Sequence, residues 1–412
     1  MLLENFMSHK DLIVVYFASI VQVCNYALFG HAITFLAAEY MPLDVSTNPT
    51  TSIFVLLGAT SIAKPIGAVI YGIIGDYYSR RLAIRTASLL STLAVISIGF
   101  IPAYQRIGML SSILFILCRS IFIMGLIGET DGVRIYVFET VDKYKNLANG
   151  IIAGCWQIGA QLAVLLLLVA NINNFQYSWR LCFITGGVLG LLAFFQSKHL
   201  KINNIKTSKT TTASKLFQSC KLIPEYWRLL IPCIIIHGCI GAIYSFQLYF
   251  LPVYVIKMLN IVDYNNMNFT ILLALLLYSI MAVWSGYLAD KYYLHYQTIF
   301  SALMLSIIFS TVNMAMMISY QKFLPVLYII PILLIPFYSV PLQVKVCKLF
   351  SDNIRLRLFS LSHSVGSVLI SAQICAISAL AYNKANFLPM LILILLFLIL
   401  GLTVLVIKPR IQ

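Results

Sequence analysis

The stretch GIIGDYYSRR, residues 72–81, decides how the rest of the sequence is interpreted. It ends one long apolar segment with Asp76 and begins the next with Arg80 and Arg81. A second copy of its Gly-x-x-x-Asp spacing, GYLAD at 286–290, closes another apolar segment in the second half of the chain. Charged side chains at the edge of an apolar layer need partners. The first copy therefore predicts an ion-pair cluster at a short turn between two helices.

The composition indicates a membrane protein. The 412 residues are 61% hydrophobic and 10% charged, and their mean hydropathy is +0.92, whereas soluble domains carry roughly 25% charged residues. Apolar runs of about 20 residues, which cross a bilayer as helices, recur along the chain, and they lack the two-residue alternation of barrel strands. We predict an all-α membrane fold with twelve transmembrane helices. The predicted spans are 12–36, 52–74, 83–103, 110–135, 148–170, 178–196, 230–255, 268–289, 298–318, 324–344, 357–382 and 387–407.

The net charge of +15 is explained by the positions of the basic residues. If both termini are cytoplasmic, 20 of the 28 Lys and Arg residues lie on the cytoplasmic side and only four lie in the opposite loops. This asymmetry follows the positive-inside rule. It predicts a multi-pass membrane protein with both termini in the cytoplasm, and no nucleic-acid partner is needed to explain the charge.

The longest polar interruption, 197–228, divides the predicted spans into six and six. We expect it to be a cytoplasmic linker, a flexible tether without activity of its own. It would join an N-terminal six-helix bundle, 1–196, to a C-terminal six-helix bundle, 229–412. Each half carries Gly-x-x-x-Asp after its second helix, as an internal duplication would leave it, and parallel repeats of this kind are known in transporters. We expect two pseudo-symmetric bundles in a monomer.

The sequence contains no pattern that indicates catalysis or a cofactor. Its nine cysteines lie mostly in apolar spans without a Cys-x-x-Cys pair, and its six histidines are scattered. The phosphate-binding pattern Gly-x-x-x-x-Gly-Lys-(Ser/Thr) does not occur. We therefore expect no enzyme activity, no cofactor, no metal and no ATP drive, so that any transport would depend on gradients.

The loop around Asp76 resembles the signature of the major facilitator superfamily, Gly-x-x-x-Asp-(Arg/Lys)-x-Gly-(Arg/Lys)-(Arg/Lys). Gly72, Asp76, Arg80 and Arg81 match this pattern, whereas Tyr77 and Ser79 stand where a base and a glycine are usual. The resemblance implies that this loop is a latch, which holds one conformation closed at the cytoplasmic end. Because of their positions, we assign five further charged residues to the latch: Glu139, Asp142, Asp290, Arg355 and Arg357.

Two other segments resemble the metabolite:proton symporter branch of this superfamily, which includes proline/betaine transporters. They are AKPIGAVIYG in the second span and CRSIFIMGLIGETDGVRIYVFE in the fourth. The resemblance implies uptake of a small polar organic solute, with proline, betaine or a carboxylic metabolite ahead of sugars. It also implies proton symport through alternating access across the lipid bilayer.

Gln22 and Asn25 lie about three turns into the first span and share one helix face. Amides at that depth should face the central cavity or bond to a neighbouring helix. Glu and Asp are usual here in the resembling branch. An amide cannot titrate, so the chain carries protons elsewhere or not at all. An uncoupled facilitator or exchanger therefore stays open, and the departures at Tyr77 and Ser79 leave a non-transporting sensor open.

Five charged residues lie within the predicted second and fourth spans: Lys64, Arg119, Glu129, Asp131 and Arg134. Lys64 lies about 18 Å into its helix, where a lone cation is costly. It either pairs with an internal carboxylate or binds a carboxylate of the solute, and Arg119 is similarly deep. Asp131 and Arg134 can pair along the helix. Glu129 is then either the proton-binding group or part of a permanent structural network.

Weaker candidates for the pathway are Gln157 in the fifth span and Tyr244 with Gln247 in the seventh. An aromatic face such as that of Tyr244 can hold a quaternary ammonium group. Three histidines, His31, His237 and His363, also lie within spans. For each of them a structural role and a proton relay remain alternatives.

Overall fold

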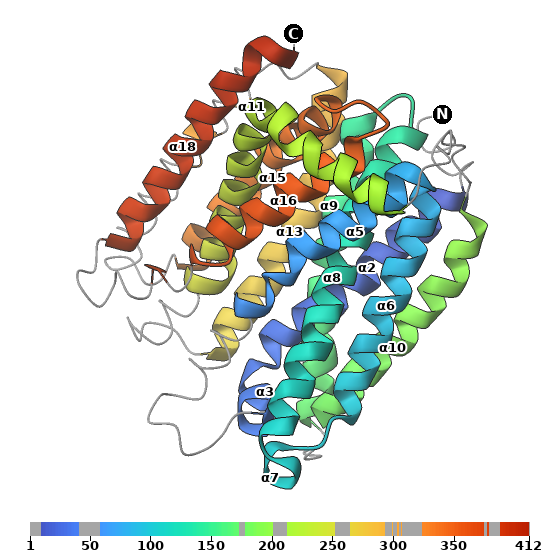
Figure 1. Cartoon of the computed structure of the whole chain (residues 1–412). Coiled ribbons are helices and arrows are strands. Elements are labelled where there is room, and N and C mark those ends of the chain that lie inside the picture. The colour runs from blue at the N-terminus through green and yellow to red at the C-terminus, as the bar shows by residue number, and fades with distance from the viewer. Residues whose placement is uncertain are drawn as a thin grey trace. The chain divides into compact units, whose positions relative to one another are not determined.

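The computed structural model describes residues 10–40, 58–172, 178–200, 212–251, 264–292, 324–374 and 388–411, with short pieces at 299, 303–304, 306 and 377–378. Within these ranges every regular element is a helix (Figure 1). The chain divides into two compact units. Unit 1 contains Met1–Glu139, Cys155–Cys220 and Asp352–Leu361, and unit 2 contains Thr140–Gly154, Lys221–Ser351 and Ser362–Gln412.

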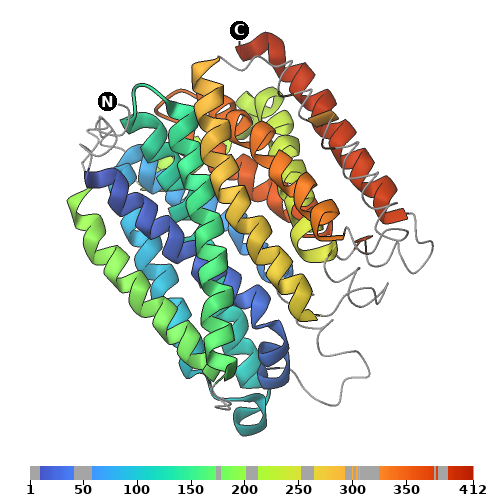
Figure 2. The same ribbon diagram turned by 180° about the vertical axis from the view of Figure 1, so that it is seen from behind.

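Unit 1 is built mainly from the first helices of the chain. They are α2 (Lys10–His31), α3 (Ile33–Tyr40), α5 (Ala63–Tyr77), α6 (Arg80–Phe100), α7 (Tyr104–Ile107), α8 (Met109–Thr140), α10 (Ser178–Gln196) and the short η1 (Ser197–His199). Helix α6 packs against α5 and α10, and α10 packs against α2, as Figure 2 shows from behind.

Aromatic rings form the core of unit 1 between α2, α8 and α10. Phe29 is completely buried, and its ring centroid lies 5.1 Å from that of Phe122 and 5.0 Å from that of Phe183. Phe115 continues the cluster by stacking on Tyr40, at a centroid distance of 4.8 Å. Burial of such large side chains supplies most of the apolar area that holds these helices together.

Unit 2 is built mainly from the later helices. They are α11 (Thr212–Ser245), η2 (Phe246–Phe250), α13 (Tyr264–Lys291), α15 (Leu324–Lys348), η5 (Ser367–Ser371) and α18 (Leu388–Ile411). Helix α13 packs against α15. Four helices are divided between the units. Helix α9 (Lys145–Ile172) begins in unit 2, whereas α11 and α16 (Arg355–Gly366) begin in unit 1, and the last residue of α8, Thr140, lies in unit 2.

Nine helices within the described residues are long and apolar enough to cross a bilayer. They correspond to the first eight predicted spans and to the tenth. The eleventh predicted span, 357–382, contains α16 and η5, and the twelfth contains most of α18. The ninth, 298–318, lies almost wholly outside the described residues. The predicted all-helical membrane class is confirmed.

Many helix boundaries differ by a few residues from the sequence-based prediction, and three of the differences change how the helices are connected. The first span is interrupted by a turn at Ala32. Helix α8 continues to Thr140, five residues past its predicted end at 135, so Glu139 lies on the same helix as Glu129. Helix α11 begins at Thr212, inside the predicted linker 197–228. A helix of 34 residues is about 51 Å long, which exceeds the hydrocarbon thickness.

Candidate functional site

Asp76, the last but one residue of α5, caps the start of α16. Its carboxylate accepts hydrogen bonds from the backbone amides of Leu356 and Arg357, at 3.2 and 3.1 Å. Amides in the first turn of a helix have no partner within that helix, and an acid placed there also complements the helix dipole. Asp76 is only 3% exposed, so these donors take the place of water.

Three arginines surround Asp76 and a second acid, Glu139. Arg357 donates from Nε to Asp76 at 2.9 Å, and Arg80 forms an ion pair with the same carboxylate. Arg80 and Arg355 each donate to Glu139, and both contacts measure 3.0 Å. Arg80 is 1% exposed. Buried guanidinium groups are tolerated when charges and hydrogen bonds satisfy them, and this set, the Asp76 cluster, provides both.

The two departures from the superfamily pattern both contribute to this region. The hydroxyl of Tyr77 accepts a hydrogen bond from Nη1 of Arg357 at 3.2 Å, and its ring lies 4.5 Å from that guanidinium group. Ser79 is the N-cap of α6, where its Oγ accepts from the amide of Leu82 at 3.1 Å. Both residues therefore add contacts at the turn.

Gly72 allows α5 to approach α16 closely. A Cβ at this position would lie 2.8 Å from the Cα of Arg357, which real side chains do not tolerate. Arg81 was predicted to belong to the latch, but it donates instead to the carbonyl of Lys198. Asp290 lies in unit 2, apart from the contacts of Asp76. Of the predicted latch residues, the structure therefore brings together Gly72, Asp76, Arg80, Glu139, Arg355 and Arg357.

The second Gly-x-x-x-Asp copy makes a similar cap within unit 2. Asp290 accepts hydrogen bonds from the backbone amide of Leu147 at 2.8 Å and from Nδ2 and the amide of Asn146 at 2.7 and 3.2 Å. These residues form the first turn of α9. A Cβ on Gly286 would lie 2.9 Å from the Cα of Leu147. We call this set the Asp290 cap. The groups that donate these hydrogen bonds to Asp290 are neutral.

Arg119 on α8 is a buried cation among aromatic rings. Its guanidinium lies 3.8 Å from the ring centroid of Phe29 and 5.4 Å from that of Tyr26, and it is 4% exposed. Within the described part of the chain it forms no ion pair with a carboxylate. The ammonium of Lys64 lies 6.0 Å from the same Tyr26 ring. Two cationic side chains therefore flank one aromatic ring, and they can attract an anionic group.

Glu129 is a buried acid further along α8. It is 1% exposed, and it is hydrogen-bonded to Ser88. No basic side chain of the described residues forms an ion pair with it, and its Oε2 has no hydrogen-bond partner there. Glu129 is therefore an acid that is surrounded by protein atoms rather than by water.

Asp131 and Arg134 are buried beside Glu129 on α8, with exposed fractions of 0% and 2%. The guanidinium of Arg134 lies 4.5 Å from the ring of Trp156 on α9 and 5.8 Å from that of Phe359 on α16. Arg134 therefore packs as a cation against aromatic faces, in addition to its other contacts.

The amides of the first span bond to neighbouring helices. Gln22 accepts a hydrogen bond from Oγ of Ser91 on α6 at 3.3 Å, and Asn25 donates to the carbonyl of Gly186 on α10 at 3.2 Å. These bonds agree with one of the two alternatives left open for these residues. They also tie α2 to the helices on which it packs.

The weaker candidates belong to different units. Gln157 is 4% exposed on α9 in unit 1, and Gln247 is 2% exposed within η2 in unit 2. Tyr244, also in unit 2, packs edge-to-face on Tyr278, at a centroid distance of 6.2 Å.

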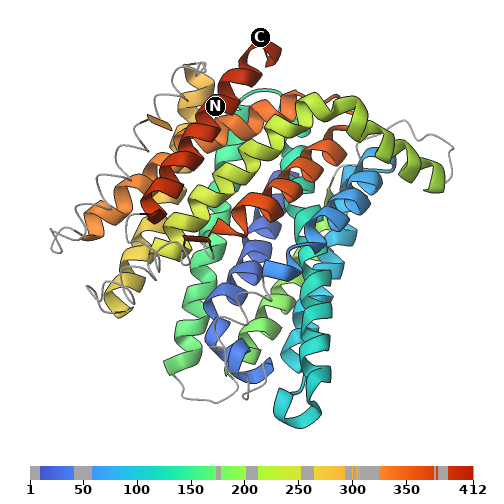
Figure 3. The same ribbon diagram turned by 60° about the vertical axis from the view of Figure 1, so that its left-hand side comes forward.

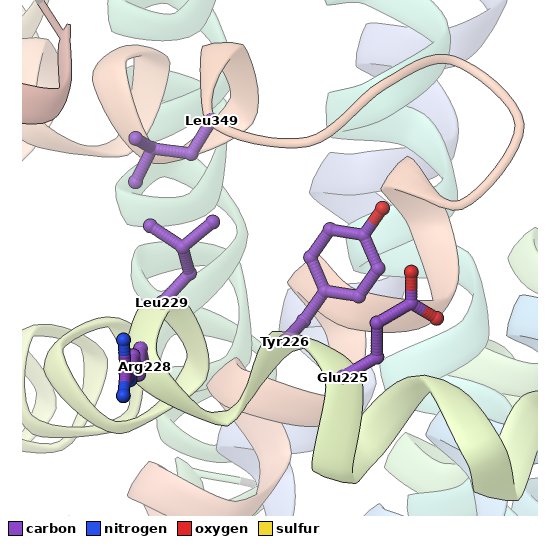
Figure 4. Close-up of a pocket in the computed structure, with 5 residues that line it drawn as sticks. All are labelled: Glu225, Tyr226, Arg228, Leu229 and Leu349. Carbon is purple, nitrogen blue, oxygen red and sulfur yellow. The ribbon is translucent and has the colours of Figure 1, made fainter.

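A hollow of about 600 Å³ lies in unit 2, between α11 and the residue that follows α15. It is lined by Glu225, Tyr226, Arg228, Leu229 and Leu349 (Figure 4). None of the candidate residues proposed from the sequence lines it. The sequence gives no local pattern for this hollow, because its lining residues come from positions more than a hundred residues apart, such as Leu229 and Leu349.

Long apolar helices and buried charged side chains define a polytopic membrane protein. Residues 18–373 match the family model described as Major Facilitator Superfamily. The chain belongs to the Major Facilitator Superfamily.

Curated relatives carry names that refer to proline/betaine transport. A Staphylococcus aureus (strain COL) protein is 23% identical over 276 residues, which are 65% of this chain and 59% of the relative. The "Proline/betaine transporter" of Escherichia coli (strain K12) is 24% identical over 251 residues, which are 56% of this chain and 49% of the relative. The chain thus spans about half to three fifths of the length of these relatives.

Solved structures share the fold at low sequence identity. The proton:xylose symporter XylE, bound to 6-bromo-6-deoxy-D-glucose, superposes with a TM-score of 0.73 at 14% identity, over 97% of this chain and 95% of that chain. FucP in the outward conformation superposes with a TM-score of 0.71 at 12% identity, over 97% and 98% of the two chains. The predicted major facilitator fold and the resemblance to proline/betaine transporters are confirmed, and the chain is a multi-pass membrane protein.

Proposed function

We propose that this chain is a secondary active transporter of the bacterial inner membrane. It takes up a small organic solute with a carboxylate group, such as proline, a betaine or a carboxylic metabolite, together with a proton. The observation that carries this proposal is the buried Arg119, which has no carboxylate partner among the described residues. The names of the curated relatives support the same class of solute.

Arg119 is suited to bind the carboxylate of the solute. A guanidinium group that lacks a counter-ion in a low-dielectric interior is unfavourable, and a bound carboxylate would relieve this. Tyr26 lies beside both Arg119 and Lys64, and its ring face can attract the quaternary ammonium of a betaine. A zwitterion therefore fits a site where a cation and an aromatic ring adjoin.

Glu129 is the candidate proton-binding group in unit 1. It replaces the acids that the resembling branch usually carries at Gln22 and Asn25. Its burial, its bond to Ser88 and its lack of an ion pair support this role. Glu129 is neutral when it is protonated and negative when it is not. The net charge of a solute site beside Glu129 would therefore change each time a proton binds or leaves.

The Asp76 cluster is the proposed latch. It ties the turn between α5 and α6 to the start of α16 through charged hydrogen bonds. In an alternating-access cycle such a tie would hold one conformation closed, and the transition would have to break it. We place this latch on the cytoplasmic side, as the distribution of basic residues predicts.

Uptake of radiolabelled proline and glycine betaine into proteoliposomes tests the proposal. Replacement of Arg119 by Met should weaken apparent solute affinity by about 100-fold, because truncation of one partner of a buried charge pair costs roughly 2–5 kcal/mol. Arg106→Met is the matched control, since Arg106 lies exposed on α7. Equal affinity in Arg119→Met and wild type would contradict the role of Arg119.

An uncoupled facilitator or exchanger is the second candidate, and the bonding of Gln22 and Asn25 favours it. Both amides are engaged in helix packing, and neither can titrate. An inward-directed pH gradient should accelerate wild-type uptake but leave Glu129→Gln uptake unchanged if symport operates through Glu129. Wild-type uptake that ignores the gradient would reject symport and favour the facilitator.

A further inference from the structure

Two histidines from distant parts of the sequence meet inside unit 2. His237 on α11 and His363 on α16 have ring centroids 5.2 Å apart, and the rings are tilted by 55°. His237 is 3% exposed, and its Nδ1 lies 3.2 Å from Oγ of Ser362. The sequence offered only two scattered histidines, 126 positions apart, whereas the fold makes them neighbours.

A backbone contact between α11 and α16 fixes the distance between these rings. A Cβ on Gly238 would lie 2.9 Å from the carbonyl oxygen of Gly366, and a Cβ on Gly366 would lie 2.7 Å from the amide nitrogen of Gly238. Gly238 follows His237 directly, and Gly366 lies three residues after His363. The two helices are seen side by side in Figure 3. The imidazoles are therefore carried by two helices that approach each other closely at these glycines.

The polar seam between these helices extends beyond the rings. The hydroxyls of Ser245 and Ser371 lie 3.4 Å apart, eight residues after His237 and His363 respectively. Ser245 directly precedes the π-helical segment η2, and Ser371 is the last residue of the π-helical segment η5. Short π-helical segments occur frequently at functional sites. The two serines therefore lie at π-helical segments, eight residues along the chain from the histidine pair.

We propose that His237 and His363 together form a binding site for a single proton. Imidazole is the side chain whose charge changes within the physiological pH range. Two cationic rings at this distance would repel one another strongly in a low-dielectric interior, so a second proton is excluded. One proton can be stabilised by the lone pair of the neutral ring and by the hydroxyl of Ser362. This site is distinct from Glu129, which lies in unit 1.

The helices of unit 2 carry other titratable groups. Those within the spans are Tyr226, Cys233, Cys239 and Tyr244 on α11, Tyr278 and Tyr287 on α13, and Tyr328, Tyr338 and Cys347 on α15. Charged residues lie at helix ends: Glu225 and Arg228 on α11, Asp290 and Lys291 on α13, Lys345 and Lys348 on α15, and Arg355 and Arg357 on α16. Glu225 precedes His237 by 12 residues, which is about 18 Å along the helix. The pair itself is therefore the proposed proton site, and no described carboxylate adjoins it in sequence.

Nitrogen NMR of the full chain, labelled with ¹⁵N-histidine and reconstituted in lipid nanodiscs, tests this site without any solute. Between about pH 8 and pH 5, His237 and His363 should titrate together and take up one proton in total. In His363→Gln the titration of His237 should change, whereas His31→Gln, which removes another histidine within a span, should leave it as in wild type. A purely structural pair would show no such dependence.

Two outcomes would overturn the proposal. One is uptake of two independent protons, or of none, by the pair in the wild-type chain. The other is a His237 titration that His363→Gln leaves unaltered. If His363→Gln does not fold, the wild-type titration alone still decides. Because no transport is measured, this result stands or falls separately from symport through Glu129.

Discussion

The two Gly-x-x-x-Asp copies form similar contacts but with different strength. In each copy the acid accepts hydrogen bonds from the first turn of a helix, and the glycine lets that turn approach. Asp76 also forms ion pairs with Arg80 and Arg357. Asp290 instead accepts hydrogen bonds from neutral amide groups of Asn146 and Leu147. Both copies therefore cap a helix with the same geometry, but ion pairs with arginines are described for Asp76 in the first copy.

This difference has energetic consequences. Loss of a neutral helix cap costs about 0.5–2 kcal/mol. Removal of one partner from a buried ion pair costs about 3–5 kcal/mol, because the other charge stays buried without compensation. The Asp76 cluster should consequently be the harder contact to break and the more sensitive to mutation. If it opens in each transport cycle, its partners must be satisfied in the open state as well.

The largest effect should come from replacing the two acids. Asp76→Asn leaves Arg80 and Arg357 without their shared counter-charge, so we expect the initial uptake rate to fall by about 100-fold, as roughly 3 kcal/mol implies. Asp290→Asn keeps an oxygen acceptor for the α9 amides, so we expect a loss of about threefold. Uptake into proteoliposomes at equal protein content measures both. Equal decreases of the uptake rate in Asp76→Asn and Asp290→Asn would contradict the difference in strength between the two copies.

The two glycines should respond alike, because their role is steric in both copies. A methyl group at Gly72 or Gly286 meets backbone atoms of the capped helix, and such overpacking costs about 1–3 kcal/mol. We expect Gly72→Ala and Gly286→Ala to lower the thermal unfolding midpoint by similar amounts. Gly30→Ala is the control, since nothing lies within 4 Å of a Cβ there. A lower unfolding midpoint in only one of the two variants would show that the helices do not approach equally closely at Gly72 and Gly286.

Tyr77 should give the smallest effect. Tyr77→Phe removes the hydroxyl that accepts from Arg357 but keeps the ring beneath the guanidinium. Loss of one hydrogen bond to a charged group costs about 1.5–3 kcal/mol when it is buried and less where water can replace it. Because this residue is only partly buried, we expect about a twofold decrease in uptake rate. An unchanged rate would make Tyr77 a bystander of the Asp76 cluster.

The sequence predicted the class of fold and much of the Asp76 cluster. Asp76, Arg80, Glu139 and Arg355 meet as the charge pattern indicated, since buried ions have few alternatives in an apolar chain. Arg81 does not join them, because it follows Arg80 by about 100° around α6 and reaches the carbonyl of Lys198. The helical periodicity of α6 alone would have predicted that Arg80 and Arg81 point in different directions.

Other contacts have no signal in a single sequence. Asn146 supports Asp290 from 144 positions away, and Ser88 bonds to Glu129 from another helix. Such partners are ordinary polar residues that matter only because of the way the helices pack. The extension of α8 to Thr140 was also missed, because Glu129, Asp131 and Arg134 looked like the polar end of a span. Their burial in the structure lets the helix continue past them.

The most direct test of the latch is a distance measurement across the Asp76 cluster by pulsed electron paramagnetic resonance. Spin labels at Tyr78→Cys and Asn353→Cys, in a chain without native cysteines, would occupy exposed positions on either side of the cluster. We predict one short distance without solute, a second and longer distance when proline or betaine is added, and mainly the longer distance in Asp76→Asn. A single distance that neither solute nor Asp76→Asn alters would contradict the latch.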